Sequence, residues 1–518
     1  MRTQILLISF GLSRLLSVEA QVQFELFKSS DDVLERRDET IELPVANAKT
    51  HYRSRMYIGA QLQEVEVLID TGSSDFWVID QEIECNGDNA LLKCPNHATF
   101  DKSGSTSFRR NKDLGDFSIS YGDGSSAKGI YGSDNIRLGS VNGPVIKAAN
   151  FAVANDTSSS EAVCGIGMLA GESMAKNINY MGQVWPTYSN LPVQMKEQGL
   201  IQHTSYSLWL NELDELEGSL LFGAIDHSKF EGDLQRVPLI ASKNLPIPID
   251  FSVMLHGLTY HNAVTSESLL TSCNMRVLID CGTTYSMLPM RLITPLMQEI
   301  GAEFSEGHNI YVLPGEKFDS VKNNSIIFNL SGVEIRTPLR ELLVPMFSQG
   351  PLDSHSASYY VTLLPVSDSK SSTYILSDSF LKNAYVVFDL ENKEIALAQS
   401  RTNGGSDRQI ELIGKDGIKS IKKAPLYGNT KSAFKVVTIK SDAKPDVKDT
   451  NGTAAHQGNT STSTRVSSAN SAATGTAISE SPSSSGLLSS SSASTNNGLA
   501  LKLHKILFSL ALFVGVLI

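Results

Sequence analysis

Short apolar runs recur along the chain between about residue 40 and residue 402. They are rich in β-branched and aromatic residues, and Gly, Asp, Asn and Ser separate them, which is typical of β-strands joined by turns. The runs are 64–70, 116–123, 206–212, 218–226, 276–280, 324–332, 358–366 and 384–390. Residues 292–302, "LITPLMQEIGA", instead show the spacing of an amphipathic helix, and "YGDG" at 121–124 predicts a hairpin tip. The pattern predicts an all-β fold with a few short helices.

Two of these runs are copies of one another. The stretch "EVEVLIDTGSSDFWV" at 64–78 aligns with "NMRVLIDCGTTYSML" at 274–288. In each copy an apolar strand ends in Asp, and a small polar residue, Gly and hydroxyl residues follow it. An internal repeat in a chain of 518 residues indicates two equivalent structural units. We therefore expect two lobes, 38–225 and 226–402, each of which contributes one Asp.

The two aspartates at the strand ends are candidate catalytic residues. Asp70 and Asp280 lie where a charged side chain is unfavourable unless nearby groups stabilise it. The glycines that follow allow backbone N–H groups to approach the carboxylates, and the hydroxyls of Ser73 and Thr283 can fix their orientation. If the two loops meet, the carboxylates cannot both ionise and must share a proton. One carboxylate can then activate a water while the other carboxyl donates to a carbonyl oxygen, which hydrolyses a peptide bond without a metal or cofactor.

The N-terminus has the features of a chain that enters the secretory pathway. A basic start, the apolar stretch 5–12 and a small-residue site at 18–20 predict a signal peptide at 1–20, and an amphipathic helix is the alternative. The dibasic pair Arg36-Arg37 lies in an acidic, polar stretch that would suit a processing protease. We expect a propeptide at 21–37 that is cleaved after Arg37, although the arginine pair could also be accidental.

The C-terminal part has the composition of a stalk with a lipid-attachment signal. Ser and Thr make up more than half of residues 460–495, so this segment cannot bury enough apolar surface to fold, and we expect an O-glycosylated stalk at 403–496. Small residues at 496–498, a short spacer and the apolar tail 506–518 match a GPI signal. Asn496 is the expected acceptor, Asn497 is the next candidate, and 497–518 would be removed. A tail-anchored membrane protein is the alternative.

Charge and glycosylation motifs narrow the class of protein further. The net charge is −11 and no Lys/Arg stripe is present, which argues against nucleic-acid binding. We expect a monomer that binds peptide and protein substrates, attaches to a membrane through the lipid, and uses no metal or cofactor. Sequons that match entry into the secretory pathway occur at Asn155, Asn323, Asn329, Asn451 and Asn459.

The two Asp loops, "DTGSSDFWV" and "DCGTT", resemble those of pepsin-type aspartic proteases, which are the established example of a proton-sharing carboxylate pair. Further matching motifs follow in order. They are "MYIGA" at 56–60, "YGDGSSAKG" at 121–129, "GIGM" at 165–168, "LLFGAIDHSKFEG" at 220–232 and "ILSDSFLKNAYVVFDLENKEIALA" at 375–398. Together with both chain ends, the sequence closely resembles the yapsins, which are fungal cell-surface aspartic endopeptidases. The resemblance implies a bilobal pepsin-like fold.

The resemblance also implies roles for individual residues. Asp70 and Asp280 would form the catalytic dyad, with Ser73, Thr283 and Gly122 beside the substrate. Tyr121 would be the flap tyrosine that closes over substrate and bonds Trp77, although ordinary packing is the simpler explanation for these two residues alone. Asp123 matches the flap Asp of fungal relatives that accept a basic residue before the scissile bond. A carboxylate at a hairpin tip would attract Lys or Arg, and a solvated turn residue is the alternative.

The cysteines and one serine depart from the family pattern. Of the five cysteines, Cys85 and Cys94 match the first-lobe disulfide of the family. The second-lobe disulfide is absent from the pattern, and the pairing of Cys164, Cys273 and Cys281 stays open. In the family this position is a Thr or Ser whose hydroxyl forms a hydrogen bond between the two lobes. Cys281 replaces it here, and a thiol is a weak hydrogen-bond donor and acceptor. Ser377 stands where the family usually has Gly.

The sequence thus predicts a cell-surface aspartic endopeptidase that cuts near Lys or Arg. Its expected substrates are surface or secreted proteins and precursors, and its expected role is cell wall maintenance. The alternative is a catalytically weak or inactive protease-fold protein at the surface that binds peptides or supports the wall. A protease that is secreted without an anchor is a third hypothesis, which differs only in location.

Overall fold

The fold is known from a computed structural model. It describes residues 22–25, 43–47, 52–83, 99–175, 177–178, 182–211, 217–242, 245–346, 358–366, 373–405, 407–431 and 433–441. Several sequence predictions lie outside these residues. They are the signal peptide 1–20, cleavage after Arg37, the disulfide between Cys85 and Cys94, glycosylation of Asn451 and Asn459, and the lipid acceptor Asn496.

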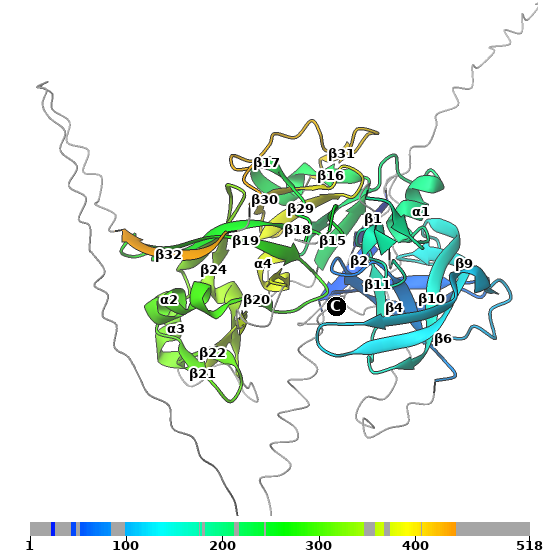
Figure 1. Ribbon diagram of the computed structural model, residues 1–518, viewed down its shortest axis with the longest axis horizontal. Coiled ribbons are helices and arrows are strands. Elements are labelled where there is room, and N and C mark those ends of the chain that lie inside the picture. The colour runs from blue at the N-terminus through cyan, green and yellow to red at the C-terminus, as the bar shows by residue number, and fades with distance from the viewer. Residues whose placement is uncertain are drawn as a thin grey trace, which may run out of the picture. The chain divides into compact units, whose positions relative to one another are not determined.

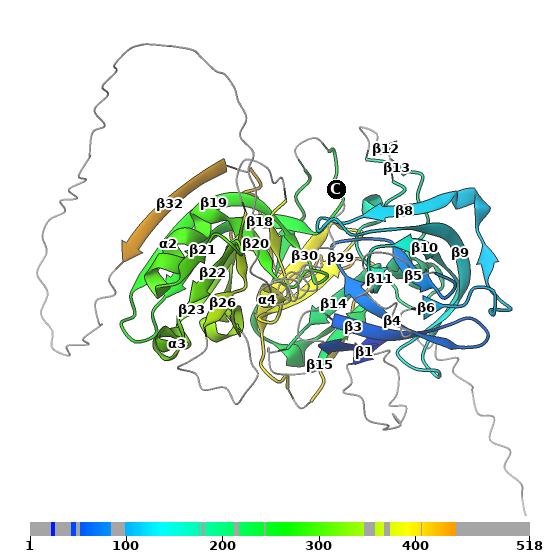
Figure 2. The ribbon, with the colours of Figure 1, turned by 90° about the horizontal axis from the view of Figure 1, so that it is seen from below.

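The first half of the described chain forms most of one large sheet (Figures 1 and 2). Within the described residues its main strand order is β17-β30-β29-β14-β15-β2-β3-β4-β11-β5-β10-β9-β7, with β1, β6 and β8 paired alongside. The strands from the first half are β1 Val22–Glu25, β2 Leu43–Asn47, β3 Tyr52–Ile58, β4 Gln63–Asp70, β5 Phe76–Asp80, β6 Thr99–Phe100, β7 Arg109–Arg110, β8 Asp116–Ser120, β9 Ser126–Leu138, β10 Val145–Thr157, β11 Ala162–Gly165, β14 Ser205–Trp209 and β15 Glu217–Phe222.

The second half adds three strands to that sheet and builds sheets of its own. β17 Phe230–Pro238, β29 Ala384–Asp389 and β30 Glu394–Ser400 extend the large sheet past β14, so the expected border between lobes at 225 is not a border of this sheet. The other strands are β18 Ser252–His261, β19 Ser268–Ile279, β20 Ser286–Pro289, β21 Glu303–Ser305, β22 Ile310–Leu313, β23 Ser325–Leu330, β24 Val333–Pro338, β25 Leu343–Pro345, β26 Tyr359–Val361, β27 Leu363–Val366, β28 Ile375–Leu376 and β32 Ala433–Ser441. β24-β23-β18-β19-β28-β20-β27 form one sheet, with β32 on β19, and β21-β22-β26-β25 form another.

Helices are short and few in the part of the chain that the structure describes. They are α1 Leu191–Glu197, α2 Met290–Ile300, α3 Gly315–Val321 and α4 Asp378–Leu381. α2 confirms the expected amphipathic helix and begins two residues before the predicted start. It buries Leu292, Ile293 and Leu296 against the core, and it ends at Gly301, whose φ of +74° suits a left-handed C-terminal cap.

The repeat seen in the sequence is also a repeat in the structure. In the first copy β4 lies parallel to β11, and the register places Ile69 opposite Cys164 and Asp70 opposite Gly165. In the second copy β19 lies parallel to β28, and Ile279 pairs with Leu376. Each Asp is therefore reached at the end of a buried strand beside a short parallel neighbour, as the two-lobe hypothesis requires.

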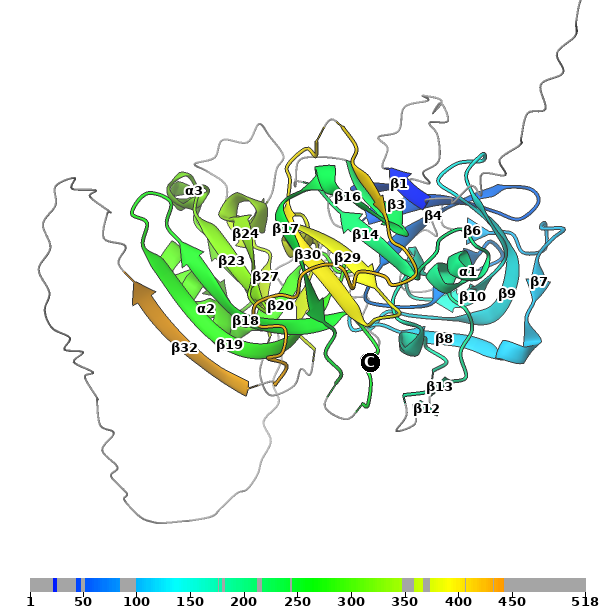
Figure 3. The ribbon, with the colours of Figure 1, turned by 90° about the horizontal axis from the view of Figure 1, so that it is seen from above.

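Beyond β30 the chain stays packed on the sheet, where the sequence predicts the start of a stalk. We call residues 407–431 the C-terminal strap; Figure 3 shows it in gold beside β16, β17 and the β29–β30 pair. Its strand β31, Ile410–Leu412, pairs antiparallel with β16, Ala224–Asp226. Ile413, Ile418 and Ala424 are buried. The predicted stalk boundary at 403 is therefore too early, because three apolar side chains of the strap complete the core.

Buried polar groups also hold the strap in place. Asp389 accepts from the backbone N–H of Ile418 over 3.0 Å. Arg236 donates from Nε to the carbonyl of Ile421 over 2.8 Å and binds both oxygens of Glu394 through Nη1 at 2.9 Å. Removing the strap would leave the buried Asp389 and the partly buried Arg236 without some of their partners, which is costly.

We predict that a chain ending at residue 402 is much less stable than one ending at 441. Burying Ile413 and Ile418 contributes about 1.5–3 kcal/mol each, in addition to the polar contacts. Urea unfolding at a fixed pH measures the difference, and a chain ending at 431 separates the strap from β32. Equal unfolding midpoints for the 402 and 441 chains would contradict the structural role of the strap.

Candidate active site

The first Asp loop follows β4. Asp70 is fully buried. The N–H of Gly72 donates to its Oδ1 over 2.7 Å, and the hydroxyl of Ser73 donates to its Oδ2 over 2.5 Å. The backbone of Asp70 is held as well, because its carbonyl accepts from Ile166 N over 2.9 Å. Both carboxylate oxygens are thus fixed by the Gly and hydroxyl residues that the sequence indicates.

The second loop, which follows β19, repeats this arrangement. Asp280 is also fully buried. Gly282 N donates to its Oδ1 over 2.8 Å, and Thr283 Oγ1 donates to its Oδ2 over 2.7 Å. The N–H of Asp280 donates to the carbonyl of Leu376 over 3.0 Å. The two carboxylates therefore have matching hydrogen-bond partners.

Hydrogen bonds between the two loops bring the carboxylates together. Thr71 Oγ1 donates to the carbonyl of Ile279 over 3.1 Å and accepts from the N–H of Cys281 over 3.0 Å. Gly282 packs directly on the other carboxylate, since a Cβ at this position would lie 2.3 Å from Oδ1 of Asp70. Any side chain there would push the two loops apart, so Gly282 sets their close approach.

Burial and mutual repulsion change the ionisation of the pair. Burial raises the pKa of Asp70, and the negative charge of Asp280 raises it further. Burial also raises the pKa of Asp280, while hydrogen bonds from Thr283 and Gly282 oppose that rise. Two carboxyls in this arrangement favour sharing one proton, because the charge of one opposes ionisation of the other, and such a pair can supply both a general base and a general acid.

The predicted hairpin tip lies between β8 and β9. Tyr121 N donates to Ser125 O over 2.8 Å, and Gly124, at φ +88°, donates from its N–H to Tyr121 O over 3.0 Å. Tyr121 is buried and accepts a 2.7 Å hydrogen bond from Trp77 Nε1, as expected. Burial raises the pKa of Tyr121 well above its usual range, and the negative charge of Asp70 raises it further.

The tip itself is exposed. Gly122 and Asp123 both lie at the surface. Oδ1 of Asp123 accepts from the N–H of Ser125 over 2.7 Å, so the carboxylate also stabilises the turn. This bond is that of an ordinary turn Asp, and it leaves the exposed carboxylate able to meet a cationic group from solvent.

Comparison with known proteins agrees with the geometry. The family model described as "Eukaryotic aspartyl protease" matches residues 51–400. The chain belongs to this family.

Relatives of this aspartyl protease include proteins from yeasts. Aspartic proteinase 3 of Saccharomyces cerevisiae is 32% identical, over 83% of this chain and 83% of that protein. Aspartic proteinase yapsin-3 of the same species is 33% identical, over 79% of this chain and 77% of that protein. Candidapepsin of Candida tropicalis is 29% identical, over 76% of this chain and 90% of that protein. The protein is thus an aspartic endopeptidase of the yapsin type.

A solved structure agrees on the fold of the aspartyl protease. The aspartic proteinase from Irpex lacteus matches with a TM-score of 0.54 at 19% identity, over 70% of this chain and 98% of that chain. At this identity the likeness shows the fold alone. The expected all-β, pepsin-like fold is therefore confirmed.

Two buried carboxyls beside the protease's Asp pair received no role from the sequence. Asp75 accepts from Ser173 N over 2.7 Å and from the hydroxyls of Tyr131 and Tyr188 over 3.1 Å each. Asp378 follows β28, and burial raises its pKa well above the usual range. Both residues lie inside motifs that resemble the family, and that position is the sequence signal that could have identified them as part of the site. The tyrosine partners of Asp75 could not be predicted from the motif, because they are 56 and 113 residues away in the sequence.

The three cysteines with an open pairing are unpaired and buried. Cys281 donates from Sγ to the carbonyl of Ile69 over 3.3 Å, and Cys273 donates to Leu255 O over 3.5 Å. Burial raises the pKa of all three thiols, so each forms a thiolate less readily than a thiol in water. A disulfide from Cys281 to Cys273 or Cys164, which the sequence left open, is not present.

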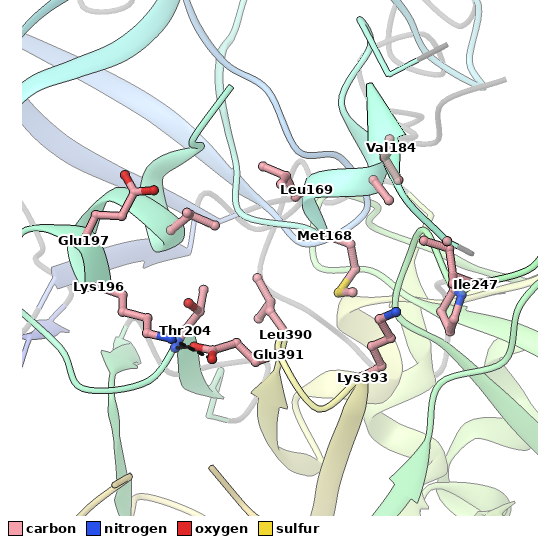
Figure 4. A pocket seen from close by; sticks show the side chains of 14 residues that line it. Met168, Leu169, Val184, Lys196, Glu197, Thr204, Ile247, Leu390, Glu391 and Lys393 are labelled. Atoms are coloured by element: carbon pink, nitrogen blue, oxygen red, sulfur yellow. Dashed lines mark hydrogen bonds and ion pairs between the residues drawn. The ribbon is translucent and has the colours of Figure 1, made fainter. Parts of the chain in front are cut away.

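The structure also has a cavity of about 570 Å³ (Figure 4). It is lined by α1, the loop after β11 and the turn between β29 and β30. Lys196 and Glu391 form a 2.6 Å ion pair at its edge, and Met168 and Ile247 give it an apolar wall. Neither Asp70 nor Asp280 lines this cavity, so we do not assign it to catalysis. Within the described residues no group of His, Cys, Asp or Glu is arranged to hold a metal ion.

We predict that Asp70→Asn flattens the dependence of stability on pH. In the native protein the pKa of Asp70 is raised above its ordinary value of 3.8, so the folded state binds more protons than the unfolded state above that pH. The free energy of unfolding then falls as pH rises, by at most about 1.4 kcal/mol per pH unit for one proton. Asn cannot ionise, so this part of the fall disappears.

Urea unfolding at about pH 4.5, 6 and 7.5 measures this effect, because the fall begins once the unfolded Asp has ionised. The exposed Asp123→Asn serves as the matched control and should keep the wild-type slope. An Asp70→Asn protein whose stability falls with pH as steeply as that of the wild type would refute the shared-proton assignment.

Proposed function

We propose that Asp70 and Asp280 are the catalytic dyad of this endopeptidase. The observation that carries the proposal is the pair of matched loops, each with a Gly N–H and a hydroxyl on its carboxylate, bonded to each other through Thr71. One ionised carboxylate removes a proton from a water that attacks the scissile carbonyl. The protonated partner donates to the carbonyl oxygen, which gives a gem-diol intermediate. The first carboxyl then passes the proton taken from water to the leaving amine, and the second carboxylate takes a proton back from the diol as the C–N bond breaks, which restores the single shared proton.

The surrounding side chains keep the two carboxyls in their roles. Ser73 and Thr283 hold one oxygen of each carboxylate, so neither group has to reorient during the reaction. Tyr121 lies at the start of the hairpin tip, fixed by Trp77, where it can close over the substrate beside Asp70. Gly122 and Asp123 would then contact the substrate from the exposed tip.

We further propose that the protease prefers a basic residue before the scissile bond. Asp123 is exposed at the tip, two residues after Tyr121, whose hydroxyl is bonded to Trp77. A Lys or Arg side chain of the substrate could reach this carboxylate while the peptide lies over the dyad. The attraction would orient the peptide and speed its association, since complementary charges across a binding surface steer the two partners together.

The prediction is that Asp123→Ser lowers kcat/KM for a Lys/Arg-containing peptide by about tenfold and changes that for an apolar peptide by less than about twofold, as the loss of one charge pair would give. Cleavage is measured between about pH 4 and 6, where one proton is shared. Equal losses for both peptides would refute the basic preference.

Two controls test the chemistry itself in the same assay. Asp70→Asn and Asp280→Asn should each remove cleavage of both peptides while leaving the fold intact. A folded wild-type chain, freed of residues 21–37, that cuts neither peptide would favour the alternative of a weak or inactive surface protein. The weak thiol of Cys281 at the junction of the two loops is the observation that motivates this alternative.

We propose that the protein is made as a secreted precursor with residues 1–20 as signal peptide and 21–37 as propeptide. The strand β1 lies inside this propeptide and pairs antiparallel with β15, with Val22 opposite Phe222. Cleavage after Arg37 would therefore remove a strand from the large sheet. The sequons at Asn155 and Asn323 are exposed and Asn329 is half-buried, so the first two are the better acceptors.

We also propose that a GPI lipid at Asn496 holds the monomeric enzyme at the plasma membrane or cell wall, on a stalk that begins after the strap. There it would act on surface or secreted proteins and precursors and help to maintain the wall. No helix within the described residues is long and apolar enough to cross a membrane. The tail 506–518 lies outside those residues.

The expected result is that a phosphatidylinositol-specific phospholipase releases the protein from a membrane fraction. Asn496→Gln together with Asn497→Gln should abolish the lipid and send the chain to the medium. Membrane-bound protein that resists the phospholipase would favour the tail-anchored alternative, and wild type found only in the medium would favour free secretion.

A further inference from the structure

The two copies of the Asp loop differ at the residue next to each Asp on the neighbouring strand. In the first copy this residue is Gly165, and a Cβ there would lie 2.7 Å from Asp75 N and 2.8 Å from Asp75 O. No side chain fits. In the second copy the pairing of Ile279 with Leu376 places Ser377 at the same point beside Asp280. The second copy thus has room for a side chain that the first copy excludes.

Ser377 uses this room to bind the loop that carries Asp280. Its side chain is completely buried. Its hydroxyl donates to the carbonyl of Thr284 over 3.0 Å, and its backbone N–H donates to Ser286 Oγ over 3.1 Å. Thr284 directly follows Thr283, whose hydroxyl holds Oδ2 of Asp280. The Ser377 hydroxyl therefore fixes the backbone beside the group that orients the carboxylate.

The two copies also differ where the two loops cross, and there the stronger side-chain hydrogen bonds come from the first copy. Thr71 makes two hydrogen bonds across the junction, at 3.1 Å and 3.0 Å. Its counterpart Cys281 donates to Ile69 O over 3.3 Å through sulfur. Because a thiol is a weak donor and a weak acceptor, the side chain that the Asp280 loop contributes to the junction makes a weaker bond than the side chain that the Asp70 loop contributes. The loop whose own side chain makes this weaker bond is the loop that Ser377 binds through the carbonyl of Thr284.

We propose that Ser377 is a positioning residue for Asp280 whose hydroxyl compensates for the weak thiol bond of Cys281. The inference rests on the proposed function of Asp280. Cys281 makes its bond at the first residue of one short loop, 281–284, and Ser377 binds the last residue of that loop. Loss of either bond would let the loop shift. Because the Cys281 bond is weak, the position of the loop depends more strongly on the Ser377 bond. The effects of the two side chains on catalysis are therefore not additive.

A double-mutant cycle tests the coupling on the full chain with Ser377→Ala, Cys281→Ser and the double variant. Ala removes the hydroxyl and keeps the backbone preference, and Ser supplies a stronger donor of similar size. Ser377→Ala should lower kcat about tenfold with KM changed less than about twofold, as the loss of one buried hydrogen bond at the catalytic centre would give. In the Cys281→Ser background the same change should lower kcat by only about twofold.

The pH profile separates positioning from simple loss of stability. Two carboxyls held close together have well-separated apparent pKa values, and loosening one of them brings the values together. The bell-shaped dependence of kcat/KM on pH should therefore become narrower in Ser377→Ala and wider again in the double variant. Ser379→Ala is the matched control, because Ser379 is buried in the same hydroxyl cluster and bonds Ser286 and Ser377. The pH dependence of kcat/KM in Ser379→Ala should be as wide as in the wild type.

The outcomes are distinguishable from failure of the proposed function. Wild type must first cleave the peptide and Asp70→Asn must abolish cleavage, otherwise the dyad assignment itself fails. Given that activity, equal loss of kcat from Ser377→Ala in both backgrounds, or an unchanged pH profile, overturns the compensation. If Ser377→Ala does not fold, Ser377→Gly, which copies Gly165, takes its place in the cycle and is judged by the same criteria.

Discussion

The active centre depends on one buried hydroxyl, that of Thr71, which joins the two halves of the chain. It donates to the carbonyl before Asp280 and accepts from the N–H after it, so it holds both sides of the opposite aspartate. Because the junction is buried, no water competes for these bonds, and each contributes more than it would at the surface. The separation of the two carboxyls, and with it their shared proton, follows from this contact and from the missing side chain of Gly282.

Holding two carboxyls in a dry site is unfavourable in itself, and much of the nearby structure offsets that penalty. Each carboxylate has one backbone and one hydroxyl donor, and one shared proton removes a full charge. Asp75, just after the first loop, is stabilised in the same way by two tyrosines and a backbone N–H. Burial raises the pKa of these groups, which makes the site better suited to acidic than to alkaline solution.

The sequence alone predicts the parts of the site that are local. The strand ending in Asp, the Gly and the hydroxyl residue lie within a few positions of one another, so the contacts on Asp70 and Asp280 follow from the motif. Contacts between distant segments do not follow in this way. The strap illustrates the limit: its spaced apolar residues, Ile413, Ile418 and Ala424, resemble those of a polar linker until the sheet that buries them is known.

The strap also limits where the chain can be cut without damage to the folded enzyme. Ile413, Ile418 and Ala424 are buried, and β31 is paired with β16. A protease acting on the native protein would have to detach these residues from the sheet before it could cut between them. A C-terminal cleavage that leaves this core intact therefore has to fall beyond residue 431.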